Sequence, residues 1–112
     1  MEEQEARIAN TEALFRDVNE RIAESARRFY ANEAEFVCEC ADSNCTERVR
    51  ATLDEYERVR RDGTHFLVVP GHEDSRMERV VAQPRGHLAI VEKVNAVVAR
   101  MVRRLNPRTE PA

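Results

Sequence analysis

Three cysteines within eight residues constrain this chain more than any other feature of its sequence. They stand at Cys38, Cys40 and Cys45. If residues 36–40 form a strand, Cys38 and Cys40 project to the same face, because side chains alternate along an extended backbone. A polar turn at 41–44 can then bring Cys45 back to that face. Three thiolates placed in this way supply most of a tetrahedral metal site, which lacks only a fourth ligand.

The best candidate for the fourth ligand is His72. It follows Pro70-Gly71 at the exit of an expected strand, where a sharp turn can direct the imidazole inward. His87 and Asp42 rank next. His87 opens a hairpin strand and is expected to be exposed, whereas Asp42 can reach inward from the turn between the cysteines. His65 lies early in a strand, and its distance from the cysteines depends on a register that the sequence does not give.

A thiolate-rich tetrahedral site favours zinc, because sulfur ligands and this geometry both suit that ion. A Cys3His set is closed, since protein atoms fill all four positions. The expected Zn2+ is therefore structural, and its binding adds to folding stability. Two other interpretations of the cysteines stay open: they can be thiols of an ordinary core, or they can carry redox or iron–sulfur chemistry.

Little in the sequence indicates an enzyme. The three glycines all fall at expected turns, so no glycine-rich phosphate loop exists, and the Gly-x-Ser-x-Gly motif of many hydrolases is missing. Cys45 and His72 can be imagined as nucleophile and base, but the sequence shows no third group that would orient the base. We therefore expect no catalytic residues.

The N-terminal segment, residues 1–35, is expected to consist mainly of one long helix over the first thirty residues. Apolar side chains recur there every seven residues, at Ile8, Phe15, Ile22 and Phe29. Such a row can pair with the same helix of a second copy, or it can pack against the chain's own sheet. The segment is therefore a candidate dimerisation arm.

The rest of the chain alternates between strand-like and helix-like runs. The expected strands cover 36–40, 47–51, 64–69, 78–83 and 87–92, with a short helix after Thr52 and a C-terminal helix over 94–105. This order predicts an α+β fold with a small, mostly antiparallel sheet, a long N-terminal helix, a short middle helix and a C-terminal helix, stabilised by zinc.

The length of 112 residues suits one domain. Within it, 36–92 are expected to form the zinc-binding α+β core, and 93–112 a basic helix and tail.

Charge is distributed unevenly along the chain. The net charge is −3, yet residues 93–112 hold five bases and one acid. Arg100, Arg103, Arg104 and Arg108 give one alternative function, a nucleic-acid-binding regulator that uses the C-terminal helix. The acidic remainder would repel phosphates, so nucleic acid is not the expected partner.

A membrane protein is not expected. No stretch approaches 18 uninterrupted apolar residues, and the acidic start of the chain is the opposite of a signal peptide. We expect a cytoplasmic protein.

Several runs together resemble a family of small uncharacterised bacterial proteins with a CxCx4C…PGH pattern. They are NTEALFRDVNERI over 10–22, FVCEC over 36–40, CTERV over 45–49, EYERVR over 55–60 and FLVVPGH over 66–72. The resemblance covers roughly residues 8–92 and brings no known activity. It implies that Cys38, Cys40, Cys45 and His72 belong to one recurring pattern, which suits a metal site.

These observations predict a small non-enzymatic zinc-binding protein that acts as a protein-interaction or regulatory module. Its partner is expected to be another protein, or a second copy bound through the N-terminal helix. The first alternative is a thiol-based redox sensor or enzyme that uses the same cysteines, and the second is the nucleic-acid-binding regulator.

Overall fold

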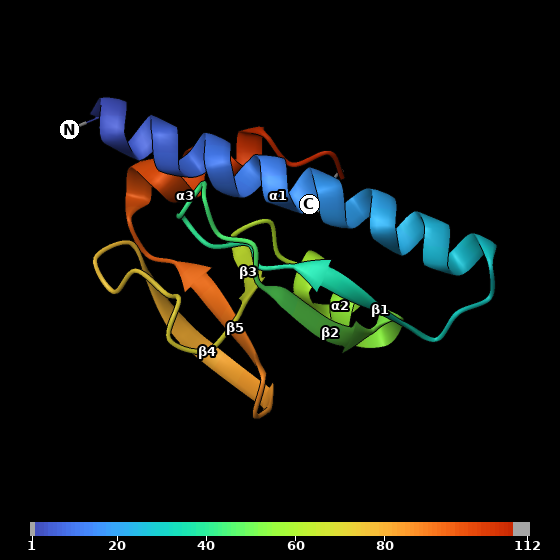
Figure 1. The fold of residues 1–112 in the computed structure, drawn as a ribbon. Helices are drawn as coiled ribbons and strands as arrows, with labels where there is room; N and C mark the ends of the chain where they lie inside the picture. Colours follow the sequence, from blue (N-terminus) through green and yellow to red (C-terminus); the bar gives the residue numbers. More distant parts are fainter. Residues whose placement is uncertain (1, 109–112) are drawn as a thin grey trace.

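The structure is a computed structural model and describes residues 2–108. Its elements are α1 (Glu2–Arg28), β1 (Glu33–Val37), β2 (Arg48–Thr52), α2 (Leu53–Arg60), β3 (His65–Val68), β4 (Glu78–Arg85), β5 (Leu88–Lys93) and α3 (Ala96–Arg104). Figure 1 shows α1 lying across the molecule, with α3 beside its N-terminal half and the strands on its other side. The predicted α+β class and the three helices are confirmed.

The strands form two antiparallel sheets, where the sequence predicted one. β1 pairs with β2, and a second sheet has the order β3-β5-β4. The chain passes from one sheet to the other at Glu39, whose backbone N–H donates to the carbonyl oxygen of Leu67 at 2.9 Å. Glu39 therefore carries the chain away from β2 and onto β3.

The first strand lies earlier than predicted, at 33–37 in place of 36–40, because α1 ends at Arg28. Tyr30 closes the helix with a left-handed backbone (φ 58), and Ala31 N–H donates to the carbonyl oxygen of Ala26 at 2.8 Å. Glycine is the usual signal for this ending, and it is missing here. The long N-terminal helix expected over the first thirty residues is confirmed, and it ends at Arg28.

The most deeply buried face of α1 is not the expected apolar row, although Ile8 and Ile22 of that row do pack against the core. Phe29 is 76% exposed, and the other members of the seven-residue row are only partly buried. The fully buried face carries small and polar side chains instead: Ala9, Glu12, Ala13, Arg16, Asn19 and Ala23. Alanines let α1 approach the core closely, and the polar side chains reach across to it.

Two of these buried polar residues attach α1 to the last third of the chain. Glu12 and Glu78 both bind the ammonium of Lys93, and all three side chains are fully buried. Burial raises the pKa of Glu12 to about 8. Arg16 donates to the carbonyl oxygens of Gly63 and Val102 at 2.9 and 2.7 Å.

Local signals in the middle of the chain are confirmed. Thr52 and Glu55 form a reciprocal capping box at the start of α2, with hydrogen bonds of 3.0 and 2.8 Å. β4 and β5 form the expected hairpin, in which β4 is the edge strand. Pro84 is tolerated there because an edge strand has backbone groups that need no ladder partner.

The basic C-terminal segment is partly neutralised by acids. Arg108 binds Glu20 and Glu57, with its closest contacts at 2.8 and 2.6 Å. Arg103 lies 3.8 Å from Asp62. These ion pairs neutralise part of the positive charge of the C-terminal segment. Over residues 2–108, none of the helices is both long and apolar enough to cross a lipid bilayer.

Candidate metal centre

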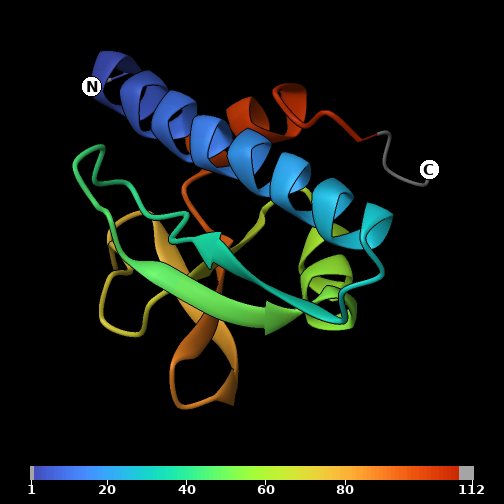
Figure 2. The ribbon, with the colours of Figure 1, turned by 45° about the vertical axis from the view of Figure 1, so that its right-hand side comes forward.

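The loop between β1 and β2 carries the three cysteines. Cys38 N–H donates to the carbonyl oxygen of Glu47 at 3.1 Å, which extends the β1–β2 ladder by one step. Cys45 N–H donates to Asp42 O at 3.0 Å, and this turn reverses the chain. Cys38 and Cys40 are buried, and Cys45 is half-buried. Figure 2 shows this loop projecting at the same end of the molecule as the N-terminus of α1.

A tight turn after β3 supplies His72. Its backbone N–H donates to the carbonyl oxygen of Val69 at 2.9 Å, and Gly71 has a φ of 95°. Proline followed by a residue of positive φ is the pattern of a type II turn, which favours glycine at this position. Glu73 steadies the turn by accepting a hydrogen bond from Gly71 N–H at 2.9 Å. The sharp turn expected from Pro70-Gly71 is thus present.

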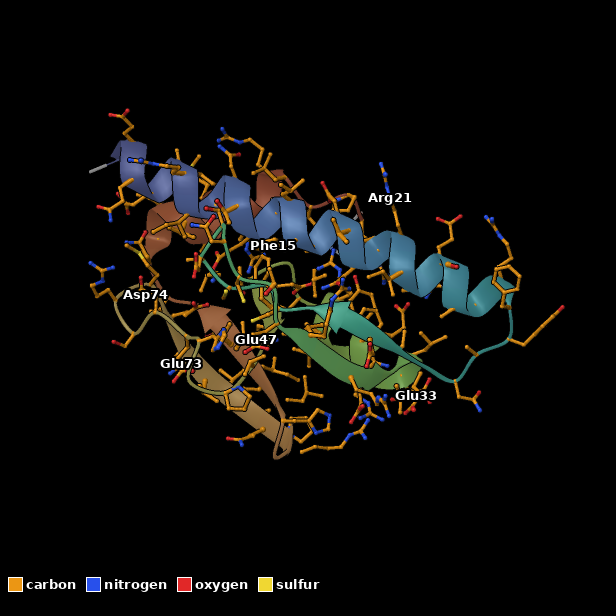
Figure 3. All side chains as sticks on the ribbon, in the orientation of Figure 1. Phe15, Arg21, Glu33, Glu47, Glu73 and Asp74 are labelled. Atoms are coloured by element: carbon orange, nitrogen blue, oxygen red, sulfur yellow. The ribbon has the colours of Figure 1, made fainter. Side chains whose placement is uncertain are left out.

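These two segments bring together the four predicted ligands. Nδ1 of His72 lies 3.7 Å from Sγ of Cys38 and 3.6 Å from Sγ of Cys45. The donor atoms of Cys38, Cys40, Cys45 and His72 all lie within 4.8 Å of one another, which is close enough for one metal ion. In Figure 3 the labelled Glu47 and Glu73, which come two residues after Cys45 and one residue after His72, both lie below the N-terminal half of α1.

The thiols differ in their readiness to ionise. The pKa of Cys40 is lowered to about 5, mainly because Cys38 donates a hydrogen bond to its sulfur. The pKa of Cys38 is raised for the same reason and by burial, and burial also raises the pKa of Cys45. This shift favours the thiolate form of Cys40, which is the form that binds a metal ion.

Backbone and side-chain donors around the cluster fix its shape. Val69 N–H donates to Sγ of Cys38 at 3.3 Å, and such a donor stabilises the thiolate form of a ligand. Asn19 on α1 binds both the N–H and the carbonyl oxygen of Val37, at 2.8 and 2.9 Å. These contacts hold the backbone just before the first cysteine.

Glu39 lies between the two buried cysteines in sequence, and its carboxylate binds elsewhere in the core. Its carboxylate accepts from Asn19 at 2.8 Å and from Leu67 N–H at 3.0 Å. The side chain is fully buried, and this burial raises the pKa of the carboxyl group. This role could not be predicted from the sequence, because a buried Asn–Glu pair does not change the hydrophobic periodicity.

The lower-ranked ligand candidates lie outside this group of donor atoms. His87 is exposed, as expected, and its Nε2 lies 2.9 Å from the carbonyl oxygen of Arg50. The Asp42 carboxylate accepts from Asn44 N–H at 2.9 Å. His65 belongs to another cluster, with Asp62 and Glu92.

Comparison with protein-family models, with curated proteins and with solved structures gives no match to this chain. The resemblance to the CxCx4C…PGH family therefore stays a proposal, and the assignment of the site depends on its geometry.

Proposed function

We propose that this chain is a small non-enzymatic protein whose fold is held by a structural Zn2+ at Cys38, Cys40, Cys45 and His72. The sulfur–nitrogen distances of 3.6 and 3.7 Å support the proposal. With Zn–S bonds of about 2.3 Å and Zn–N bonds of about 2.0 Å, tetrahedral ligands are separated by about 3.6 Å. The two sulfur–nitrogen distances thus match the separation that zinc needs, and the four donor atoms all lie within 4.8 Å of one another.

The donor set also favours a structural role over a catalytic one. Four protein ligands complete a tetrahedron, so no position is left for a water molecule or substrate. Two of the ligands are buried, and they belong to the segment that joins the two sheets. A metal here would hold the β1–β2 loop against the turn after β3 and so stabilise the fold.

Zinc content of the purified protein tests the proposal. We expect about one zinc per chain by elemental mass spectrometry, on protein made without added metal or a histidine tag. His72→Ala and Cys40→Ser should lose most of it, because each removes one ligand. His87→Ala is the matched control, since this exposed histidine lies outside the cluster, and it should keep its zinc. Metal-free protein whose three thiols all react freely with an alkylating reagent would favour the redox alternative instead.

The proposal includes the interaction role expected for α1, through apolar side chains of the helix that stay exposed. Leu14 is 61% exposed and Val18 is 38% exposed, one turn apart on the same side of the helix. Arg21 follows them and points away from the rest of the molecule in Figure 3. An antiparallel pair of α1 helices would place Leu14 of each copy against Val18 of the other, as a two-fold axis requires.

Light scattering coupled to size-exclusion chromatography tests this pairing. We expect a dimer at about 100 µM that dissociates on dilution, because the apolar patch is small. Leu14→Glu should give a monomer at every concentration. Val81→Glu is the control, since Val81 is also 41% exposed but lies on β4. A monomeric wild-type protein across this range contradicts the pairing and points to a different protein as the partner.

A further inference from the structure

A second group of metal-ligating side chains lies across the β3–β5 sheet. His65 on β3 and Glu92 on β5 face each other directly in the strand register, so their side chains share one face of the sheet. Asp62 precedes β3, and the turn that joins it to His65 is closed by the hydrogen bond from His65 N–H to Asp62 O at 3.0 Å. Nε2 of His65 and one oxygen from each carboxylate all lie within 4.8 Å of one another.

Each carboxylate is held by one oxygen and offers the other to the imidazole. Oδ1 of Asp62 accepts from the backbone N–H and the hydroxyl of Thr64, at 2.8 and 2.7 Å. Oε1 of Glu92 accepts from Arg79 at 3.0 Å. The remaining oxygens, Oδ2 of Asp62 and Oε2 of Glu92, lie 3.6 and 3.2 Å from Nε2 of His65. Such outer donors orient the ligands of a metal before it binds.

We propose that Asp62, His65 and Glu92 form a second site, which binds a divalent transition-metal ion with one nitrogen and two oxygens. Metal–ligand bonds of about 2.0–2.2 Å place neighbouring ligand atoms about 3.0–3.5 Å apart, close to the two distances observed here. The three side chains are between 24% and 38% exposed, so water can complete the coordination shell. The site is therefore open, unlike the closed cysteine cluster.

The chemistry of this site differs from that of the cysteine cluster in two further respects. Carboxylate and imidazole donors accept a wider range of ions than thiolates do, including zinc, nickel and manganese. Arg79 and Arg103 also offset part of the negative charge, since Arg103 lies 3.8 Å from Asp62. We therefore expect a weaker and more readily exchanged ion. When the metal binds, it takes the place of a proton on Nε2, and the imidazole keeps its other proton on Nδ1.

Calorimetric titration with Zn2+ tests this site in protein whose cysteine cluster already holds one equivalent. The wild-type protein should take up one more equivalent. His65→Gln, and the double variant Asp62→Asn with Glu92→Gln, should each weaken this second event more than about tenfold, because each removes direct ligands. Glu35→Gln is the matched control, since Glu35 is an exposed acid that also pairs with an arginine, Arg50, and it should bind as the wild type does.

Two results would overturn the proposal: no second equivalent in the wild-type protein, or a second event that survives in His65→Gln and in the double variant. Circular dichroism of each variant shows whether it is folded. The test of the second site is independent of the test of the cysteine cluster. Zinc bound by Cys45→Ser protein is assigned to the second site only if it disappears when His65→Gln is added to that variant.

Discussion

Removal of the metal by a chelator, with a reductant present, should lower the Tm of the protein by on the order of 15 °C. A ligand that is a thousandfold above its Kd and binds only the folded state stabilises that state by about 4 kcal/mol. In a domain of this size, each kcal/mol corresponds to about 4 °C in Tm. Far-ultraviolet circular dichroism during heating, with and without chelator, measures the effect.

The loss of structure should begin at the two segments that carry the ligands. Residues 38–45 and 69–72 have few backbone hydrogen bonds of their own, whereas α1 is a continuous helix and β5 pairs on both sides. Amide hydrogen exchange in the chelated protein should therefore accelerate first in these two loops. His87→Ala should respond to the chelator as the wild type does. An unchanged Tm after complete metal removal would show that the cluster is an ordinary part of the core.

Lys93→Met should destabilise the protein by about 3–5 kcal/mol, because it leaves the carboxyl groups of Glu12 and Glu78 buried without their cation. This is a large share of the roughly 5–15 kcal/mol that holds a typical domain together. The ammonium also lies 5.0 Å from the ring centre of Phe66, and this contact is lost as well. Urea unfolding followed by circular dichroism gives the free energy of unfolding.

The penalty should depend on pH and on the two acids. Burial already raises the pKa of Glu12 to about 8 in the wild type, and loss of Lys93, whose charge lowers this pKa, raises it further. The contribution of Glu12 to stability is therefore present at low pH and is lost as the pH rises toward that folded-state pKa. Adding Glu12→Gln and Glu78→Gln to Lys93→Met should recover much of the loss, since no buried charge then remains. If Lys93→Met is as stable as the wild type, Lys93 does not stabilise the two buried acids.

The cluster of three cysteines and His72 could be predicted from the sequence because each of its parts is a local pattern. The spacing of the cysteines, and the proline and glycine before His72, fix backbone directions over a few residues. The residues predicted to be ligands are the ones whose donor atoms lie together. The capping box at Thr52 is another local pattern, and it was predicted from the spacing of Thr52 and Glu55.

The packed face of α1 could not be predicted in the same way, because its burial depends on distant partners. Glu12 is buried against Lys93, which lies 81 positions along the chain, and Arg16 binds a carbonyl oxygen 86 positions away. A charged residue in a helix is expected to face solvent until such a partner is known. The apolar row at Ile8, Phe15 and Ile22 was therefore taken as the face that packs, on a second copy or on the sheet, although the polar face lies deeper. The division into two sheets was missed for a related reason, since the crossing depends on the bonds between Glu39 and Leu67.

X-ray absorption at the zinc edge, on protein that holds one zinc per chain, tests the central claim most directly. The account predicts a first coordination shell of three sulfur atoms at about 2.3 Å and one nitrogen at about 2.0 Å. In His72→Ala protein that still holds zinc, the nitrogen should be replaced or lost while the three sulfurs remain. A shell made only of oxygen and nitrogen, or freshly purified protein that contains no zinc, would contradict the account.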